Sequence, residues 1–243
     1  RDTFGNNKRR VAQKAIDDFI QNGMTIGMGT GTTCHYAVEA ISNKIACGEL
    51  VDVKVIPCSV ACKKHCISLG IPVSNLSYAS GSLDVMIDGA DEIDPQMAYI
   101  KGGSGSFLRE KMMENYSNQV IIIADETKLV RDLGRTSPLP VEVVSWDYER
   151  TMYLLETLPS LSNTGVRAEL RRGNINSPLA DGQYPAITDN GNMIIDLYFK
   201  RPITDIASLS EDLNSLSGVI EHGLFSGQAT TILISTCDEK NPV

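Results

Sequence analysis

Short apolar runs alternate with amphipathic helical periods through the first two-thirds of this chain. Residues 24–28, 83–87 and 119–124 are typical of strands, and the last of them is apolar after its first residue. Apolar residues recur at helical spacing over 8–21, 33–47 and 106–116. Strands without polar alternation are buried on both faces, where the intervening helices cover them. The sequence therefore predicts an α/β fold built on a parallel sheet.

The pattern changes near Gly134. Residues 135–140 are linker-like, and a strand, a helix, two strands and a helix follow, the last marked by Ile206, Leu209, Leu213 and Leu216 on one face. Residues 229–234 are then expected to form a strand that rejoins the first sheet. We expect a larger domain over 1–133 plus 215–243, and a smaller α+β domain over 134–214 inserted before the C-terminal strand.

Charge and cysteine usage exclude several classes of protein. Asp and Glu total 30 against 22 Lys and Arg, a net charge of −8, which disfavours nucleic acid and anionic membranes as partners. No apolar run approaches the ~18–20 residues of a membrane span. The six cysteines (34, 47, 58, 62, 66 and 237) are too few for a disulfide scaffold, so we expect reduced thiols in a cytoplasmic protein. Because the chain begins at Arg1 and not at Met, the question of whether a targeting segment has been removed stays open.

A glycine-rich loop follows the first strand. Residues 27–33 read Gly-Met-Gly-Thr-Gly-Thr-Thr and lead into a helix. Glycines allow a tight turn whose N–H groups converge beside the positive end of the helix dipole, and threonine hydroxyls add donors. A phosphate group fits such a loop, although neither the dinucleotide fingerprint nor the Walker pattern is met. The alternative is a connector that binds nothing.

Two further segments carry acidic or cationic groups at the ends of expected strands. Asp88, Asp91, Glu92 and Asp94 follow the strand at 83–87, where open α/β sheets bind ligands. Their repulsion is relieved by a hydroxyl-rich ligand or a divalent cation, or the segment is a solvated acidic turn. Lys128 follows the strand at 119–124, and its alternative reading is a solvated lysine.

A second glycine-rich loop begins at Lys101 and enters the helix that carries Glu110. Lys101 and the glycine amides after it could stabilise an oxyanion. Glu110 could be a catalytic carboxylate or a surface residue that pairs with Lys111.

The cysteines at 58, 62 and 66, with His65, raise the possibility of a metal site. Their four-residue intervals match no standard zinc spacing. We interpret them instead as small apolar residues packed on one helix face.

In this order the motifs resemble the ribose-5-phosphate isomerase family of the A type. The likeness covers nearly the whole chain and is carried by residues 27–33, 88–92, 101–103, 108–111, 124–128, 188–192 and 218–225. It implies a Rossmann-like larger domain, a metal-independent enzyme without a cofactor, and a homodimer or homotetramer. It also implies substrate contacts at Thr30, Gly31, Thr32, Thr33, Asp88, Gly89, Ala90, Asp91, Lys101, Gly102, Gly103, Ser104 and Lys128.

The implied reaction interconverts ribose 5-phosphate and ribulose 5-phosphate in the non-oxidative pentose phosphate pathway. A proton moves between C1 and C2 through an enediolate, and a partly buried carboxylate is a suitable base. The resemblance makes Glu110 the proton acceptor. Lys101 would stabilise the oxyanion, Asp88 would assist ring opening, and Asp91 would orient sugar hydroxyls.

Two other classes of function stay open at this point. One is a noncatalytic sugar-phosphate sensor, against which the acidic balance and the short segment before Met24 argue. The other is an enzyme of similar fold, such as a sugar-phosphate deaminase or a coenzyme A transferase.

Overall fold

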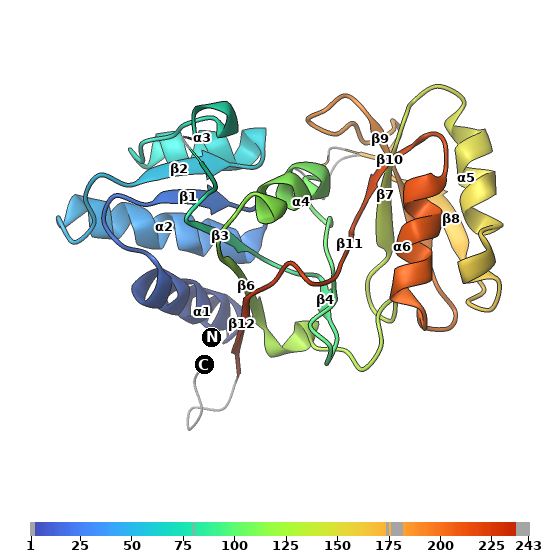
Figure 1. The fold of residues 1–243 in the computed structure, drawn as a ribbon, viewed down its shortest axis with the longest axis horizontal. Helices are drawn as coiled ribbons and strands as arrows, with labels where there is room; N and C mark the ends of the chain where they lie inside the picture. Colours follow the sequence, from blue (N-terminus) through green and yellow to red (C-terminus); the bar gives the residue numbers. More distant parts are fainter. Residues whose placement is uncertain (1–2, 80, 174, 176–181, 237–243) are drawn as a thin grey trace. The chain divides into compact units, whose positions relative to one another are not determined.

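The computed structural model describes residues 3–79, 81–173, 175 and 182–236, so Cys237 lies outside the described residues. Two compact units make up the chain (Figure 1). The first unit comprises Arg1–Ala90, Arg109–Lys128 and Gly227–Val243, and the second comprises Asp91–Leu108 and Leu129–Ser226.

A five-stranded parallel sheet forms the centre of the first unit, as the apolar runs predicted. Its strands lie in the order β12-β6-β3-β1-β2, with bounds β1 (Thr25–Met28), β2 (Lys54–Pro57), β3 (Val85–Asp88), β6 (Val120–Asp125) and β12 (Thr231–Ser235). The helices are α1 (Thr3–Phe19), α2 (Thr32–Ala46), α3 (Val60–Ser68) and α4 (Phe107–Asn115), with short 3₁₀ turns η1 (Leu76–Tyr78) and η2 (Glu126–Lys128). The expected return of the last strand is confirmed, because β12 pairs with β6 in parallel.

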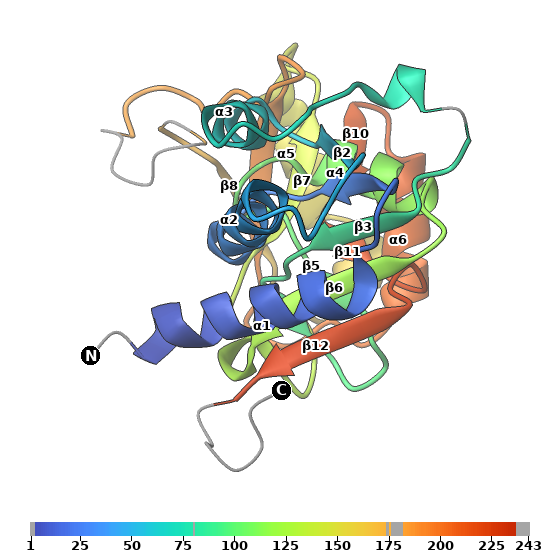
Figure 2. The ribbon, with the colours of Figure 1, turned by 90° about the vertical axis from the view of Figure 1, so that its left-hand side faces the viewer.

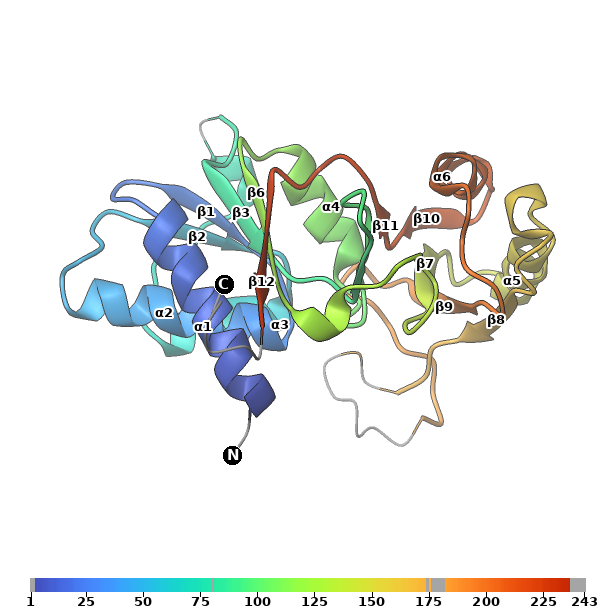
Figure 3. The same cartoon turned by 90° about the horizontal axis from the view of Figure 1, so that it is seen from below.

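The central strands β1, β3 and β6 are buried on both faces, which explains their continuous apolar sequences. One face packs against α1 and α2, where Ile26, Val85 and Ile121 join a cluster with Ile16 and Ile41. Figure 3 shows α4 on the other side of the sheet from α1. Figure 2 shows α1 running alongside β12.

The strand order reverses direction beside β1. The chain goes from β1 through α2 to β2 on one side, and β3 then pairs on the other side of β1. In register, Met28 lies opposite Ile87, so the residues that follow β1 and the last residue of β3 meet at one edge. Crevices at such reversal points are where open α/β sheets bind ligands.

The second unit contains two antiparallel sheets. The larger has the order β10-β7-β9-β8 and the smaller β11-β5-β4. The strands are β4 (Glu92–Ile93), β5 (Tyr99–Ile100), β7 (Leu139–Val143), β8 (Arg167–Leu170), β9 (Met193–Tyr198), β10 (Val219–His222) and β11 (Leu224–Phe225). Two helices, α5 (Tyr148–Glu156) and α6 (Ile206–Ser215), and the turn η3 (Pro159–Leu161) complete it. Val141, Ile195, Leu155, Leu209 and Leu213 belong to its own apolar core.

Several details differ from the expectations. Residues 139–140 were expected in a linker, but they begin β7. The second unit contains the expected 134–214 and also 91–108, 129–133 and 215–226. The reason is pairing: β10 joins β7, and β11 joins the β4–β5 hairpin.

Candidate active site

The glycine-rich loop of the first unit connects β1 to α2. The Gly29 N–H donates to the Ile87 carbonyl at 2.9 Å, which ties the loop to the end of β3. Gly31 caps α2 with φ of 143°, in the region that favours glycine. Thr32 is the first helical residue, and the Lys8 ammonium donates to its hydroxyl at 2.9 Å. The loop thus combines a helix N-terminus, hydroxyl donors and a cation, which together suit an anion.

Glu110 is fully buried on α4, so its alternative reading as a surface residue is wrong. Its Oε1 accepts the Thr30 N–H at 3.1 Å and the Cys58 thiol at 3.7 Å. Thr30 in turn donates its hydroxyl to Ser59 Oγ at 2.6 Å. The glycine-rich loop, the start of α3 and the carboxylate on α4 therefore form one hydrogen-bonded group.

Cys58 lies inside this group and was not singled out as functional by its sequence pattern. Burial, and then the charges of Glu110 and Asp88, raise the pKa of its thiol well above the usual value. The thiol is therefore neutral at physiological pH, and it can act as a donor to Glu110.

Asp88 is the last residue of β3 and is fully buried. Its Oδ1 accepts the Gly89 N–H at 2.7 Å and the Cys34 thiol at 3.6 Å. A Cβ placed on Gly29 would lie 1.9 Å from the same oxygen. The glycine therefore leaves the space that the Asp88 carboxylate occupies.

Asp91 and Lys101 come together in the second unit. Glu92 pairs with Ile100 across the β4–β5 hairpin. Asp91 and Lys101 lie just outside that pair, so they are on adjacent chain segments. The Asp91 N–H donates to the Ile100 carbonyl at 2.8 Å, and Asp91 Oδ2 accepts the Gly103 N–H at 2.9 Å. That amide was expected among the oxyanion donors, but here it is engaged by Asp91.

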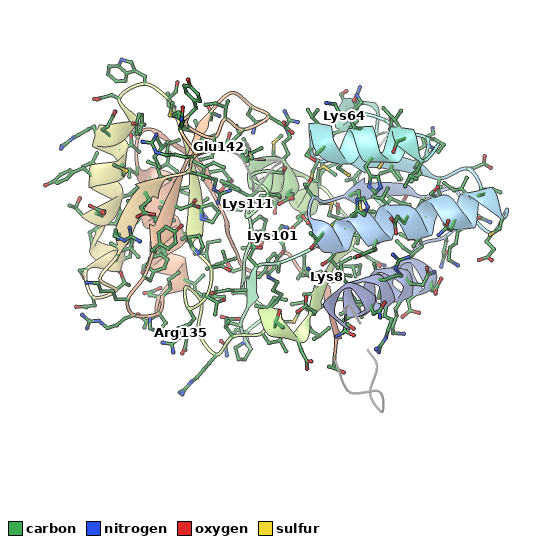
Figure 4. All side chains as sticks on the ribbon, turned by 180° about the vertical axis from the view of Figure 1, so that it is seen from behind. Lys8, Lys64, Lys101, Lys111, Arg135 and Glu142 are labelled. Atoms are coloured by element: carbon green, nitrogen blue, oxygen red, sulfur yellow. The ribbon has the colours of Figure 1, made fainter. Side chains whose placement is uncertain are left out.

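The Lys101 backbone is fixed by the joint between β10 and β11. Its N–H donates to the Gly223 carbonyl at 2.8 Å, and the Gly223 N–H donates to the Pro140 carbonyl at 2.8 Å. A Cβ on Gly223 would lie 2.0 Å from the Lys101 carbonyl oxygen, so only glycine allows this approach. Lys101, which is labelled in Figure 4, is buried.

The other two carboxylates of the acidic segment bind backbone amides. The Glu92 carboxylate accepts the N–H groups of residues 134–137, including Ser137 at 2.7 Å. Asp94 Oδ1 accepts the N–H groups of Gln96 and Ala98, each at 2.9 Å. Amide donors therefore stabilise these two charges, and Glu92 and Asp94 are structural residues.

The remaining sequence expectations concern the cysteines, a metal site and Lys128. Cys62 and Cys66 lie on α3 and pack in the apolar core, as expected, whereas Cys58 precedes the helix and its thiol binds Glu110. Across the described ranges, no three His, Cys, Asp or Glu side chains are arranged to hold a metal. Lys128 ends η2, directly after β6, and is partly buried. Lys8 was not predicted as a site residue, because a single lysine on the polar side of an amphipathic helix belongs to no recognisable motif.

Comparison with known proteins gives consistent matches. The family described as ribose 5-phosphate isomerase A (phosphoriboisomerase A) matches residues 54–239. The chain is 41% identical over 229 residues to probable ribose-5-phosphate isomerase 1 of Arabidopsis thaliana, covering 94% of this chain and 84% of that protein. It is 38% identical over 232 residues to ribose-5-phosphate isomerase of Plasmodium falciparum, covering 95% and 94%.

Solved structures agree with these matches. The ribose 5-phosphate isomerase from Plasmodium falciparum superposes with a TM-score of 0.88 at 36% identity, covering 96% of this chain and 94% of that one. A D-ribose-5-phosphate isomerase in complex with phospho-erythronic acid gives a TM-score of 0.86 at 34% identity, covering 96% and 95%. Within the described part of the chain, no helix is both long enough and apolar enough to cross a bilayer.

Proposed function

Because the chain belongs to the ribose 5-phosphate isomerase A family and is a sugar-phosphate isomerase, we propose that it interconverts ribose 5-phosphate and ribulose 5-phosphate with Glu110 as the base. The observation that carries this proposal is the position of the Glu110 carboxylate. It is fully buried, and it accepts the Thr30 N–H from a loop suited to an anion. A base held beside an anion-binding loop is what a phosphorylated substrate requires.

The proposed chemistry is a proton transfer in two steps. Glu110 removes the proton from C2 of the open-chain aldose, and the electron pair forms an enediolate whose negative charge lies on oxygen. A proton passes from the oxygen on C2 to the oxygen on C1, and Glu110 returns its own proton to C1, which gives the ketose with a carbonyl at C2 and a hydroxyl on C1. No electron leaves the substrate, so the reaction needs no redox cofactor. A positioned base contributes about 10²–10⁴-fold to such a rate.

The proposed roles of the other residues follow from their charges. Thr30, Gly31, Thr32 and Thr33 would contact the phosphate at the N-terminus of α2, and Lys8 adds a local positive charge there in a chain whose net charge is −8. Lys101 would stabilise the oxyanion. Asp88 would assist ring opening, Gly89 and Ala90 would contact the substrate, and Asp91 would orient sugar hydroxyls. Gly102, Gly103, Ser104 and Lys128 would contribute to holding the substrate.

We also propose that the enzyme is metal-independent, acts in the non-oxidative pentose phosphate pathway, and is a cytoplasmic homodimer or homotetramer. Sedimentation equilibrium measures the number of subunits directly. A rate that excess EDTA leaves unchanged supports the metal-independent reaction.

The test of the function uses Glu110→Gln, which keeps the size of the side chain and removes its basicity. We expect wild-type protein to form ketopentose from ribose 5-phosphate in excess EDTA, and the variant to lose about 10²–10⁴-fold in kcat. Calorimetry should show that sugar-phosphate binding by the variant is largely retained.

The matched control is Glu114→Gln, one turn further along the same helix and also buried. It should retain turnover. A Glu110→Gln enzyme as active as this control would refute the assigned base. Binding of ribose 5-phosphate without conversion by the wild type would instead favour a sensor, and turnover of only an amino sugar phosphate would favour a deaminase.

A further inference from the structure

Arg171 follows the end of β8 in the second unit, and its guanidinium is held in a fixed orientation. Nε and Nη2 donate to the two carboxylate oxygens of Asp196 on β9, at 2.8 and 2.6 Å. The side chains of the pair are 14% and 9% exposed. The Arg171 backbone N–H donates to the Ile194 carbonyl at 2.8 Å. A two-point ion pair of this kind fixes the plane of the guanidinium as well as its position.

The remaining nitrogen of Arg171 binds the backbone of the second glycine-rich loop. Nη1 donates to the Gly102 carbonyl at 2.7 Å and approaches the Gly103 carbonyl at 3.4 Å. Both residues are glycines, so neither has a side chain that could pack against its surroundings. Gly102 has φ of 111°, and a Cβ there would lie 2.5 Å from Phe107. The Gly102 carbonyl also accepts the Gly105 N–H at 3.0 Å within the loop, so Arg171 adds a side-chain contact from the end of β8 to a carbonyl that a turn already orients.

Fixing a carbonyl also fixes the next amide. In a trans peptide the C=O and the following N–H point in opposite directions. When Arg171 holds the Gly102 carbonyl, the Gly103 N–H must point the other way, and it does so to reach Asp91 Oδ2 at 2.9 Å. One guanidinium thus connects Asp196, through a single peptide plane, to the Asp91 carboxylate.

We propose that Arg171 is a positioning residue that orients the Gly102–Gly103 peptide, and through it Asp91, for the sugar hydroxyls of the substrate. This inference rests on the proposed function, which assigns Asp91 and the Lys101 loop to substrate. Lysine cannot replace Arg171, because one ammonium cannot bind two carboxylate oxygens in a plane and a carbonyl beyond them.

The experiment compares Arg171→Ala and Arg171→Lys with Arg167→Ala, a matched control from β8 whose side chain is 61% exposed. For ribose 5-phosphate we expect kcat/KM of both Arg171 variants to fall about 10- to 100-fold, the loss expected from a small displacement of substrate-positioning groups. The control should stay within about twofold of the wild type, as a surface substitution usually does.

Chemical rescue separates positioning from mere stabilisation of the fold. Guanidinium at millimolar concentration, far below the denaturing range, should restore kcat/KM of Arg171→Ala in a saturable way, and NaCl at equal ionic strength should not. A fall without such rescue overturns the inference, and so does an Arg171→Lys enzyme that matches the control. If Arg171→Ala does not fold, the Arg171→Lys comparison alone decides.

These outcomes differ from failure of the proposed function. If the wild-type protein does not convert ribose 5-phosphate, the function itself is refuted. If the wild type is active and Arg171→Lys is unchanged, only the role of Arg171 is lost.

Discussion

Gly29 has no Cβ, and the Asp88 carboxylate occupies the space where a Cβ would be. Because an added Cβ would lie 1.9 Å from Asp88 Oδ1, Gly29→Ala must displace that side chain or the loop. We expect the free energy of unfolding to fall by about 1–3 kcal/mol, and kcat/KM to fall by about 100-fold. Urea unfolding and the isomerase assay measure the two effects.

Gly81→Ala is the control for this substitution, since a Cβ there meets nothing within 4 Å and the backbone is not in the left-handed region. Its stability and activity should match those of the wild type. Equal behaviour of the two alanine variants would contradict the steric argument.

Single residues also show how far the sequence predicts a site. The glycine-rich loop and Glu110 carry local signals, since each lies in a motif of recognisable composition. Their hydrogen bond joins residues 80 positions apart, and spacing along the chain does not predict such a contact. Cys58 and Arg171 were missed for the same reason, because their roles depend entirely on the residues that the fold brings beside them.

Ser59 is the N-cap of helix α3, and its hydroxyl oxygen accepts two hydrogen bonds. Ser59 Oγ accepts the Cys62 N–H at 2.9 Å as a helix cap, and it also accepts the Thr30 hydroxyl at 2.6 Å. Ser59→Ala should cost about 1 kcal/mol of stability through the lost cap. It should also lower kcat/KM about 2- to 10-fold, because a neutral hydrogen bond is worth about 0.5–1.5 kcal/mol.

Asp205→Ala is the matched control for the cap. Asp205 caps α6 by accepting the Ser208 N–H at 2.9 Å, in the other unit. Urea unfolding should show a similar loss of stability, whereas kcat/KM should not change. If both variants lost activity equally, the hydrogen bond between Thr30 and Ser59 would not contribute to catalysis.

Longer elements were predicted better than short ones. β6 is a continuous apolar run of strand length, and α2 repeats its helical period several times, so the type of each can be recognised from the sequence. The strands β4, β5 and β11 have two residues each, which is too short to show any period. Yet β4 and β5 form the hairpin that places Asp91 beside Lys101. The position of that pair could therefore not be predicted from the sequence.

At the scale of the whole chain, the change of pattern near Gly134 is not where the second unit begins. The chain first enters that unit at Asp91, returns to the first at Arg109, and enters again at Leu129. The entry at Asp91 falls within the acidic segment 88–94, and β4 and β5 are too short to show a period that would mark a new unit. The smaller domain expected at 134–214 is consequently a part of a discontinuous unit.

This discontinuity predicts how fragments behave. Residues 134–214 alone lack β10, which pairs with one edge of β7, and they lack the core residues Ile100 and Leu224. An exposed strand edge and a reduced core leave little to offset the entropy of folding. We expect this fragment to show no cooperative thermal transition by circular dichroism.

The control is a longer fragment, in which residues 91–108 are joined by a flexible linker to 129–226. It contains every strand of the unit and should unfold cooperatively. A sharp transition in the shorter fragment, at the midpoint of the longer one, would mean that the strands outside 134–214 are dispensable for folding.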